Sequence, residues 1–211
     1  VVRYERDLDA ATVGTLAEPF QERLIGLVIN HAPIHRRQEI AHELIQPLRN
    51  NGLPVLGAIP EDRFMLSVTV QQIIEHLNGK WVQEPENINA HVDRFLIGGN
   101  IMDSGPSYFG RYSNQAVITR AERPDIQMAS LMCDTKCLVL TGGEEPTEYI
   151  RVEANKKGVP LISVAGGTIS TAEALNGLLE RANPHSLAKV RRFATLMQEH
   201  LDMGTLIASL I

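Results

Sequence analysis

The second half of the chain alternates between short apolar runs and stretches with helical spacing, and this alternation constrains the fold more than any other feature. Apolar runs at 116–119, 137–140 and 161–164 are each followed by a polar loop and then by a helix-like stretch. Such repetition predicts a parallel sheet with right-handed crossovers. Because loops that follow parallel strands meet at one sheet edge, where open α/β sheets bind ligands, we expect the functional site there.

The first half has a similar rhythm, so the predicted fold class is α/β with two units. There we expect strands at 1–4, 24–29, 55–59 and 80–82 and helices at 9–23, 36–49 and 69–77. In the second half we expect helices at 89–96, 124–132, 146–158, 171–181 and 186–201, with an irregular stretch at 98–113. The polar, proline-containing segment 84–87 predicts a boundary between domains 1–84 and 85–211.

Composition narrows the classes of partner. With 211 residues and 44% hydrophobic content, the chain can bury a sizeable core. A net charge of −5 without a dense Lys/Arg cluster argues against a nucleic-acid surface. No apolar stretch approaches the roughly 20 residues of a membrane helix, and no signal-peptide pattern opens the chain. We therefore expect a cytoplasmic protein with neither a nucleic-acid nor a membrane partner.

Two groups of potential metal ligands or nucleophiles have simpler explanations. Cys133 and Cys137 are the only cysteines, which favours two free thiols over a disulfide or a zinc site. His31 and His35, with Glu39 and His42 nearby, have a spacing compatible with a metal site, but a solvated polar helix face is favoured, so we expect no metal. The chain also lacks a GxxxxGK[ST] loop, a nucleophile elbow and a zinc-protease helix, so we expect no catalytic residue in it.

Small, polar and charged residues fill the three loops after the apolar runs. The candidate ligand-binding residues there are Thr119, Glu122, Arg123, Asp125, Thr141, Gly142, Gly143, Thr168, Ser170 and Thr171. Helix starts gathered at one edge would present free backbone amides to an anion or a nucleotide-like ligand. Acidic side chains in these loops would oppose a bare phosphate. Each feature also has a local explanation, such as a capping box between Ser170 and Glu173, and the main alternative is a protein–protein interface.

Asn30 and Pro60 are further candidates, because each stands where a predicted strand of the first half ends. An Asn amide can pair with the edge of a purine, and a rigid Pro loop can shield its face. Spacing alone favours the simpler interpretation that both residues only terminate strands.

The motifs of both halves, taken in the order in which they occur along the chain, resemble the amino-terminal region of long bacterial phosphate acetyltransferases and their stand-alone relatives. The motifs are 27–33 and 54–62 in the first half and 116–119, 122–125, 140–143 and 168–173 in the second. In that family, a dethiobiotin-synthetase-like P-loop domain is followed by a DRTGG domain. The resemblance implies that residues 1–84 are the later half of the first domain, without its P-loop lysine and magnesium ligands. It also places Asn30 and Pro60 at the family's adenine-contacting positions.

In the second domain, Glu122-Arg123-Pro124-Asp125 replaces the usual Asp-Arg-Thr start of the naming motif. The resemblance implies that this domain is regulatory or ligand-sensing and often dimeric. The leading hypothesis is therefore a non-catalytic module that senses a small polar or nucleotide-like ligand and forms a homodimer. The alternative is part of an ATP-dependent or phosphate-acetyltransferase-type enzyme whose catalytic segments lie outside this chain. An adenine nucleotide would then be the cofactor, with Mg²⁺ only if upstream residues exist. A third hypothesis is an interaction module that uses the apolar segment 201–211.

Overall fold

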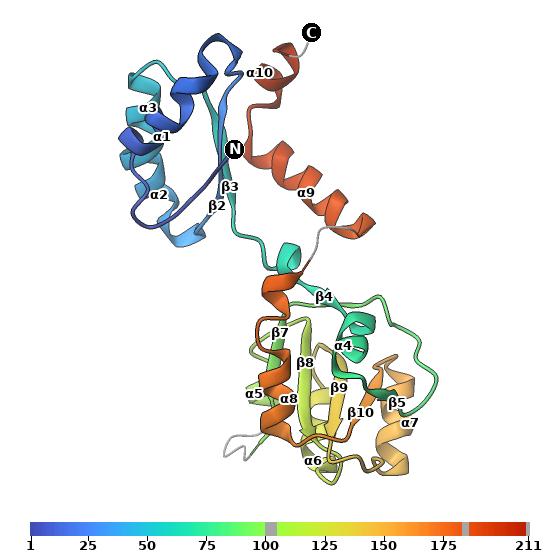
Figure 1. The fold of residues 1–211 in the computed structure, drawn as a ribbon. Coiled ribbons are helices and arrows are strands. Elements are labelled where there is room, and N and C mark those ends of the chain that lie inside the picture. The colour runs from blue at the N-terminus through green and yellow to red at the C-terminus, as the bar shows by residue number, and fades with distance from the viewer. Residues whose placement is uncertain (100–104, 183–185, 210–211) are drawn as a thin grey trace. The chain divides into compact units, whose positions relative to one another are not determined.

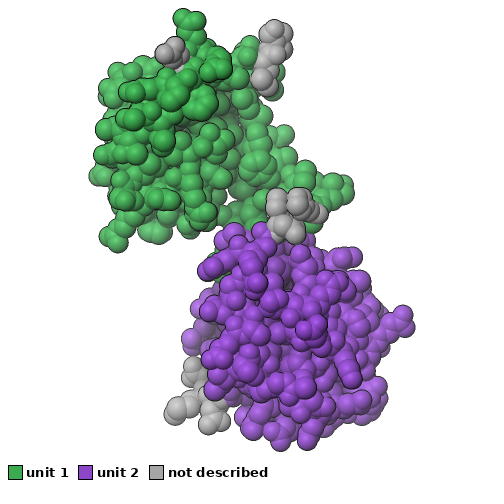
Figure 2. Space-filling model, viewed as in Figure 1, with its two compact units in different colours: residues 1–65, 184–211 green, residues 66–183 purple. Residues whose placement is uncertain are grey.

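The computed structural model describes residues 1–99, 105–182 and 186–209, and the chain forms two compact units (Figures 1 and 2). Unit 1 contains residues 1–65 and 184–211, and unit 2 contains residues 66–183. Unit 2 is thus inserted into unit 1, with a first boundary at 65/66. The sequence placed that boundary at 84/85 and assigned the carboxy-terminal helix to the second domain. The difference arises because residues 68–81 pair and pack with unit 2, as described below.

Unit 1 is built on a three-stranded parallel sheet with the order β1-β2-β3. The strands are β1 (Val2–Arg3), β2 (Leu27–Ala32) and β3 (Val55–Pro60). Strand β2 begins three residues later than its apolar run, and its first three residues are buried because both faces of the sheet are covered. One face packs against the helices that follow β1 and β2, through residues such as Val13, Ile40 and Leu48.

The helices on that face have distinct starts and interruptions. Helix α1 (Ala10–Ala17) is capped by Asp9, whose carboxylate accepts a 2.7 Å hydrogen bond from the Thr12 amide, and it continues as the 3₁₀ helix η1 (Glu18–Arg23). The predicted helix at 36–49 is a continuous series of four helical segments. They are η2 (Ile34–Arg36), α2 (Arg37–Glu39), the π-helical segment η3 (Ile40–Ile45) and α3 (Gln46–Asn50).

The other face of the unit 1 sheet is covered by the returning chain. Helices α9 (Leu187–His200) and α10 (Met203–Ala208) pack against it, with Leu196 and Leu201 buried in the same cluster as Val28, Leu56 and Ile59. The Asp202 amide donates a 2.8 Å hydrogen bond to the Leu56 carbonyl. These contacts place the predicted helix at 186–201 in unit 1 rather than in the second domain.

Unit 2 is built on a five-stranded sheet with the order β5-β10-β9-β8-β7. The strands are β5 (Lys80–Trp81), β7 (Arg94–Ile97), β8 (Gln115–Arg120), β9 (Thr135–Thr141) and β10 (Leu161–Val164). Strands β7 to β10 are parallel, and β5 is antiparallel at one edge. A separate antiparallel pair joins β4 (Val68–Thr69) to β6 (His91–Val92). The α/β fold class is confirmed, and the predicted strand at 80–82 belongs to the sheet of unit 2 rather than to the first half.

Helices cover both faces of this sheet. They are α4 (Val70–Leu77), α5 (Gly105–Phe109), α6 (Pro124–Leu131), α7 (Glu148–Lys156) and α8 (Thr168–Leu175), and a 3₁₀ turn follows at Leu179–Arg181. Buried Ile118 and Val139 pack against α4 and α8 on one face. Buried Val117 and Leu138 pack against α5, α6 and α7 on the other, around the fully buried Phe109. The result is a three-layer α/β/α unit.

Two local predictions in this region are wrong. The predicted helix at 89–96 is replaced by a turn, by β6 and by the start of β7, because Val92 pairs with Val68 and Phe95 pairs with Ala116. The stretch at 98–113 contains the short helix α5, and residues 100–104 lie outside the described residues. Pairing with distant strands therefore determines the conformation of a segment whose apolar residues also fit a helix.

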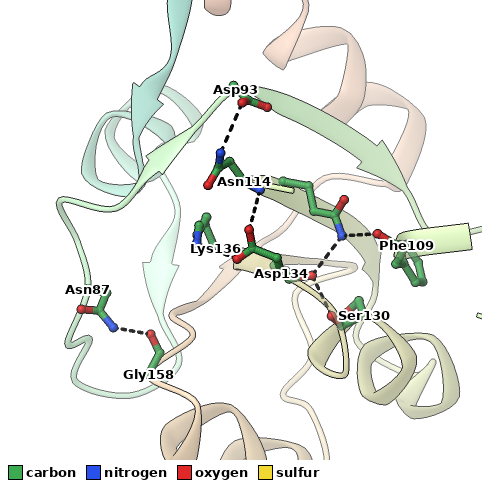
Figure 3. A network of polar contacts seen from close by, with 10 residues as sticks. Asn87, Asp93, Phe109, Asn114, Ser130, Asp134, Lys136 and Gly158 are labelled. Carbon is green, nitrogen blue, oxygen red and sulfur yellow. Dashed lines mark hydrogen bonds and ion pairs between the residues drawn. The ribbon is translucent and has the colours of Figure 1, made fainter. Parts of the chain in front are cut away.

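The amino-terminal end of this sheet is held by a polar network, which Figure 3 shows. The Gln115 side chain donates a 2.9 Å hydrogen bond to the Phe109 carbonyl, and the Thr135 hydroxyl donates a 2.7 Å bond to the Ser130 carbonyl. The Asn114 backbone amide donates a 3.2 Å hydrogen bond to the Asp134 carboxylate. These hydrogen bonds join the starts of β8 and β9 to the neighbouring helices, which is a structural role, although the Gln115 side-chain oxygen has no partner among the described residues.

Candidate functional site

Threonine side chains connect the carboxyl ends of the unit 2 strands. The Thr119 hydroxyl donates a 3.0 Å hydrogen bond to the Gly98 carbonyl. The Thr141 hydroxyl lies 3.3 Å from the Thr119 carbonyl and 2.9 Å from the Thr168 hydroxyl. Since a hydroxyl has one proton, Thr168 donates to Thr141 when Thr141 donates to the Thr119 carbonyl. Thr119 and Thr141 are buried, so these bonds fix the ends of β8 and β9 to the start of α8.

The three helices that begin at this edge lack a side-chain cap. The N-cap residues of α6, α7 and α8 are Arg123, Thr147 and Gly167, and none of them accepts a hydrogen bond through its side chain. By contrast, α1, α4, α9 and α10 are capped by Asp9, Thr69, Ser186 and Asp202. The first-turn amides of an α-helix have no partner within the helix. In α6 the first residue is Pro124, which has no amide proton, and the Ile126 amide bonds to the Asp125 carboxylate. The starts of α7 and α8 can therefore offer amides at the carboxyl edge, where anions bind favourably.

Helix α8 starts earlier than predicted, and its first turn therefore has no side-chain cap. The capping box between Ser170 and Glu173 is wrong, because the helix begins at Thr168 with Gly167 as N-cap. The exposed Ser170 hydroxyl instead donates a 3.0 Å bond to the Gly167 carbonyl. Thr171 is buried, and its amide donates to the same carbonyl at 3.0 Å. Glycine has no side chain that could cap the first turn.

Gly142 and Gly143 shape the loop after β9. Their φ values are +98° and +75°, in the region that favours glycine. The Gly142 amide donates to the Gly166 carbonyl and the Gly143 amide to the Val164 carbonyl, both at 3.0 Å. These two amides join the neighbouring loops, so the glycine pair positions the edge rather than offering donors to a ligand.

The charged residues after β8 form ion pairs with each other. The Arg123 guanidinium donates two hydrogen bonds to the Asp125 carboxylate, at 2.9 and 2.8 Å. This contact lowers the pKa of Asp125, and hydrogen bonding from the Ile126 amide lowers it further. Arg120 lies 3.2 Å from Glu122, and both of these side chains are exposed. Because exposed ion pairs contribute about 0–1 kcal/mol, little free energy is lost when Arg120 turns to a ligand, whereas the half-buried Arg123 would give up a bidentate pair.

Gln127 is a site residue that the sequence did not reveal. It is fully buried, and its amide nitrogen donates to the Arg120 and Ala121 carbonyls at 2.8 and 2.9 Å. Its side-chain oxygen has no hydrogen-bond partner among the described residues. Gln127 thereby holds the loop that carries Arg123. No motif signals this role, since a glutamine in a helix is usually a surface residue.

The candidates in unit 1 do not converge on one site. The Asn30 side-chain oxygen accepts a 2.9 Å hydrogen bond from the His31 backbone amide, a local contact at the irregular end of β2. Pro60 instead lines a cavity of about 720 Å³ whose lining residues do not include Asn30. His31 and His35 line a separate cleft with Glu39, and His31 lies 3.5 Å from Glu61. Within the described ranges, no group of three His, Cys, Asp or Glu side chains could hold a metal ion.

The two cysteines are free thiols, as the sequence predicted. Burial raises the pKa of Cys137 to about 12 and also raises the pKa of Cys133. Among the residues whose structure is described, no helix is long and apolar enough to cross a membrane.

Unit 2 thus has the features of an open parallel-sheet domain of the kind that binds ligands at its carboxyl edge. The family model named DRTGG domain matches residues 72–178, so the chain belongs to the DRTGG domain family. The matched residues lie within unit 2 and include the three loops of the candidate site.

Two curated relatives are phosphate acetyltransferases. That of Nitratidesulfovibrio vulgaris is 27% identical over 206 residues, which cover 89% of this chain and 28% of the relative. That of Synechocystis sp. is 22% identical over 189 residues, which cover 85% of this chain and 27% of the relative. The chain therefore spans little more than a quarter of the length of these relatives. The resemblance to phosphate acetyltransferases and to DRTGG proteins is confirmed.

A solved structure is also similar to this chain. It contains the CBS and DRTGG domains of the regulatory region of a Clostridium perfringens pyrophosphatase, complexed with its activator diadenosine tetraphosphate. The identity is 12% and the TM-score 0.45, over 94% of this chain and 85% of that one.

Proposed function

We propose that this chain is a non-catalytic regulatory module that binds a small anionic, nucleotide-like ligand at the carboxyl edge of the unit 2 sheet. The observation that carries the proposal is the contrast in helix capping. The three helices that begin at this edge lack side-chain caps, whereas four helices that begin elsewhere have them and the helical series that begins at Ile34 in unit 1 has none. An uncapped helix start offers hydrogen-bond donors and a partial positive charge to an anion, and α7 and α8 can supply such donors, whereas α6 begins with Pro124.

The surrounding charges favour a particular kind of anion. Arg120 can contact a ligand after opening an exposed ion pair, and Arg123 after opening its half-buried pair with Asp125. Glu122, Asp125 and Glu144 would repel a compact, highly charged phosphate. A ligand whose charge is spread out and which also carries hydrogen-bonding groups, as a nucleotide does, fits this mixture better. The buried Thr119–Thr141–Thr168 contacts would keep the loops in place before the ligand binds.

The relatives suggest what such a module would regulate. Their names assign phosphate acetyltransferase activity to proteins more than three times as long as the matched region. We propose that the module belongs to, or acts on, an enzyme of this type. The second candidate function is that the chain is itself part of an ATP-dependent or acetyl-transferring enzyme with catalytic segments elsewhere. In that case Asn30 and Pro60 would contact adenine, and Mg²⁺ would be needed only with a P-loop.

We also propose that the module forms a homodimer and works in the cytoplasm. Strand β7 is at the edge of its sheet, and beside it lies an apolar groove of about 530 Å³ with Ile97 and Ile169 in its lining. Both isoleucines are exposed. If this groove holds a second copy, Ile169→Ser should halve the molar mass measured by light scattering. An unchanged dimer mass would exclude this groove as the interface.

The proposed cytoplasmic location rests on the cysteines. Two unpaired cysteines are consistent with a reducing compartment such as the cytoplasm.

Calorimetric titration tests the proposed ligand site. ATP, ADP, AMP, a cyclic dinucleotide and acetyl-CoA are titrated into the chain, with and without Mg²⁺. We expect one of them to bind, and we expect Arg123→Ala to weaken that binding about fivefold. Arg191→Ala, which removes an exposed arginine of α9 in unit 1, is the matched control. Loss of binding in Asn30→Ala with normal binding in Arg123→Ala would support the enzyme alternative, and no binding to any ligand would contradict the proposal.

A further inference from the structure

We propose that unit 1 contains a second ligand site, in the cavity between the helical series 34–50 and α9, and that it binds a small amphipathic organic anion. The cavity has a volume of about 720 Å³, within the roughly 300–1,000 Å³ range of small-molecule sites. All its lining residues belong to unit 1, outside the residues matched by the DRTGG family. The inference is therefore independent of the site proposed in unit 2.

The cavity walls suit the apolar body of such a ligand. Ile40, Ala41 and Ile45 line one side, and Leu196 of α9 lines another. Ala58 of β3 also contributes to the lining. The other half of the lining is polar or charged and includes Glu61 and Glu199, which would repel a multiply charged anion. A ligand with an apolar body and a single anionic group fits this lining best.

The arginines at the cavity differ in whether they already have an acidic partner. Arg192 donates 2.8 and 2.7 Å hydrogen bonds to Asp62, which joins α9 to the loop after β3. Arg37 and Arg49 also line the cavity, and neither forms an ion pair with any described residue. Arg49 donates one 3.0 Å bond to the Val55 carbonyl, which leaves most of its five donors free. These two guanidinium groups can pair with a carboxylate, sulfonate or phosphate.

The wall on the helical side has an unusual backbone. Ile40–Ile45 is a π-helical segment, and the Gln46 amide bonds to the Ala41 carbonyl five residues back. The cause is Pro47, which lacks an amide proton and whose ring would clash with the Glu43 carbonyl in a regular α-helix. The π segment contributes Ile40, Ala41 and Ile45 to the lining. Such segments frequently occur at functional sites.

The other wall depends on the close approach of α9 to β3. A Cβ atom added to Gly57 would lie 2.1 Å from the His200 carbonyl oxygen, so only glycine allows the end of α9 to pack here. Since Leu196 and Arg192 belong to this helix, occupation of the cavity would hold α9 against the sheet. A ligand there would therefore stabilise the returning segment of unit 1.

Anilinonaphthalene sulfonate, an amphipathic anion with a flat apolar body, is the probe for this site, and phenylnaphthylamine is its neutral analogue. Each is titrated into the full chain by fluorescence, and methyl NMR locates the contacts. We expect the sulfonate to shift the methyl signals of Ile40, Ile45 and Leu196. We expect Arg37→Ala to weaken its binding about fivefold and to leave phenylnaphthylamine unaffected.

Three variants make the result decisive. Ala41→Phe fills the cavity from an exposed position and should weaken both probes. Arg191→Ala, on an exposed position of α9, should change neither. Arg123→Ala should also leave the sulfonate affinity unchanged, so failure of the unit 2 proposal and failure of this one are distinguishable. Absence of sulfonate binding, equal binding by Arg37→Ala and the wild type, or methyl shifts confined to Ile97 and Ile169 would overturn the inference.

Discussion

Replacing Gly57 with alanine should selectively destabilise unit 1. The added Cβ would lie 2.1 Å from the His200 carbonyl oxygen and 3.2 Å from the Leu201 Cα. Both atoms are backbone, so they cannot move aside as a flexible side chain would. The φ of Gly57 is +152°, which adds strain for any other residue. Overpacking costs about 1–3 kcal/mol and backbone strain about 1–3 kcal/mol, so we expect a loss of about 2–6 kcal/mol.

Two other glycines separate these contributions. Gly52 has a φ of +81° and no atom within 4 Å of an added Cβ, so Gly52→Ala should show the strain alone, about 1–3 kcal/mol. Gly14 lies inside α1 with no atom within 4 Å and no positive φ. Gly14→Ala should therefore stabilise unit 1 by about 0.5–1 kcal/mol, since alanine favours a helix over glycine.

Urea unfolding followed by two signals measures the effect. Trp81, the single tryptophan of the chain, lies in unit 2, whereas far-ultraviolet circular dichroism reports both units. For Gly57→Ala we expect an earlier dichroism transition, an unchanged Trp81 emission transition and faster hydrogen exchange in α9. An unfolding free energy equal to that of the wild type would refute the packing of α9 against β3.

Ionisation of three side chains in unit 2 provides further tests. Because burial raises the Cys137 pKa to about 12, iodoacetamide at pH 8 should leave Cys137 unlabelled until the chain unfolds. Cys133, whose pKa is also raised, should be labelled more slowly than a free thiol. Mass spectrometry after timed labelling measures both rates, and labelling of Cys137 before Cys133 would contradict the burial of Cys137. Because the Arg123 contact lowers the pKa of Asp125, Arg123→Ala should return that pKa toward about 3.9, as followed by carboxyl NMR. Stability from this contact should be present above about pH 4 and should disappear as pH falls through the lower folded-state pKa; an unchanged titration curve would contradict it.

The central sheet of unit 2 could be predicted because its signals are local. The apolar runs at β8, β9 and β10 are uninterrupted, bounded by polar loops and too short for a typical helix, which favours buried parallel strands. Because parallel strands run in one direction, the sequence also predicts Thr119, Thr141 and Thr168 at one edge, and hydrogen bonds connect these three residues there.

Other elements depend on partners that no local pattern identifies. The apolar residues of segment 89–96 fit both the helical period and the alternation of a strand. The segment is largely strand because β7 pairs with β8. The pattern of α9 indicates that one face is buried but does not reveal Val28 and Leu56 as its partners. Ser170 and Glu173 have capping-box spacing, yet the helix starts two residues earlier than Ser170, at Thr168, so the open helix start could not be predicted.

The most direct test of the proposed ligand site replaces Gly167 with aspartate. Gly167 is exposed, has φ −78° and ψ 168°, and an added Cβ would meet only the Ser170 hydroxyl, at 4.0 Å, so aspartate can cap α8 there. We would measure nucleotide affinity and melting temperature for Gly167→Asp and for the uncharged cap Gly167→Asn. If the free amides bind an anion, both variants should melt at a higher temperature, since a cap contributes about 0.5–2 kcal/mol. Gly167→Asp should lose nucleotide binding, and Gly167→Asn should weaken it less. A more stable Gly167→Asp variant that binds nucleotide as tightly as the wild type would contradict the proposal.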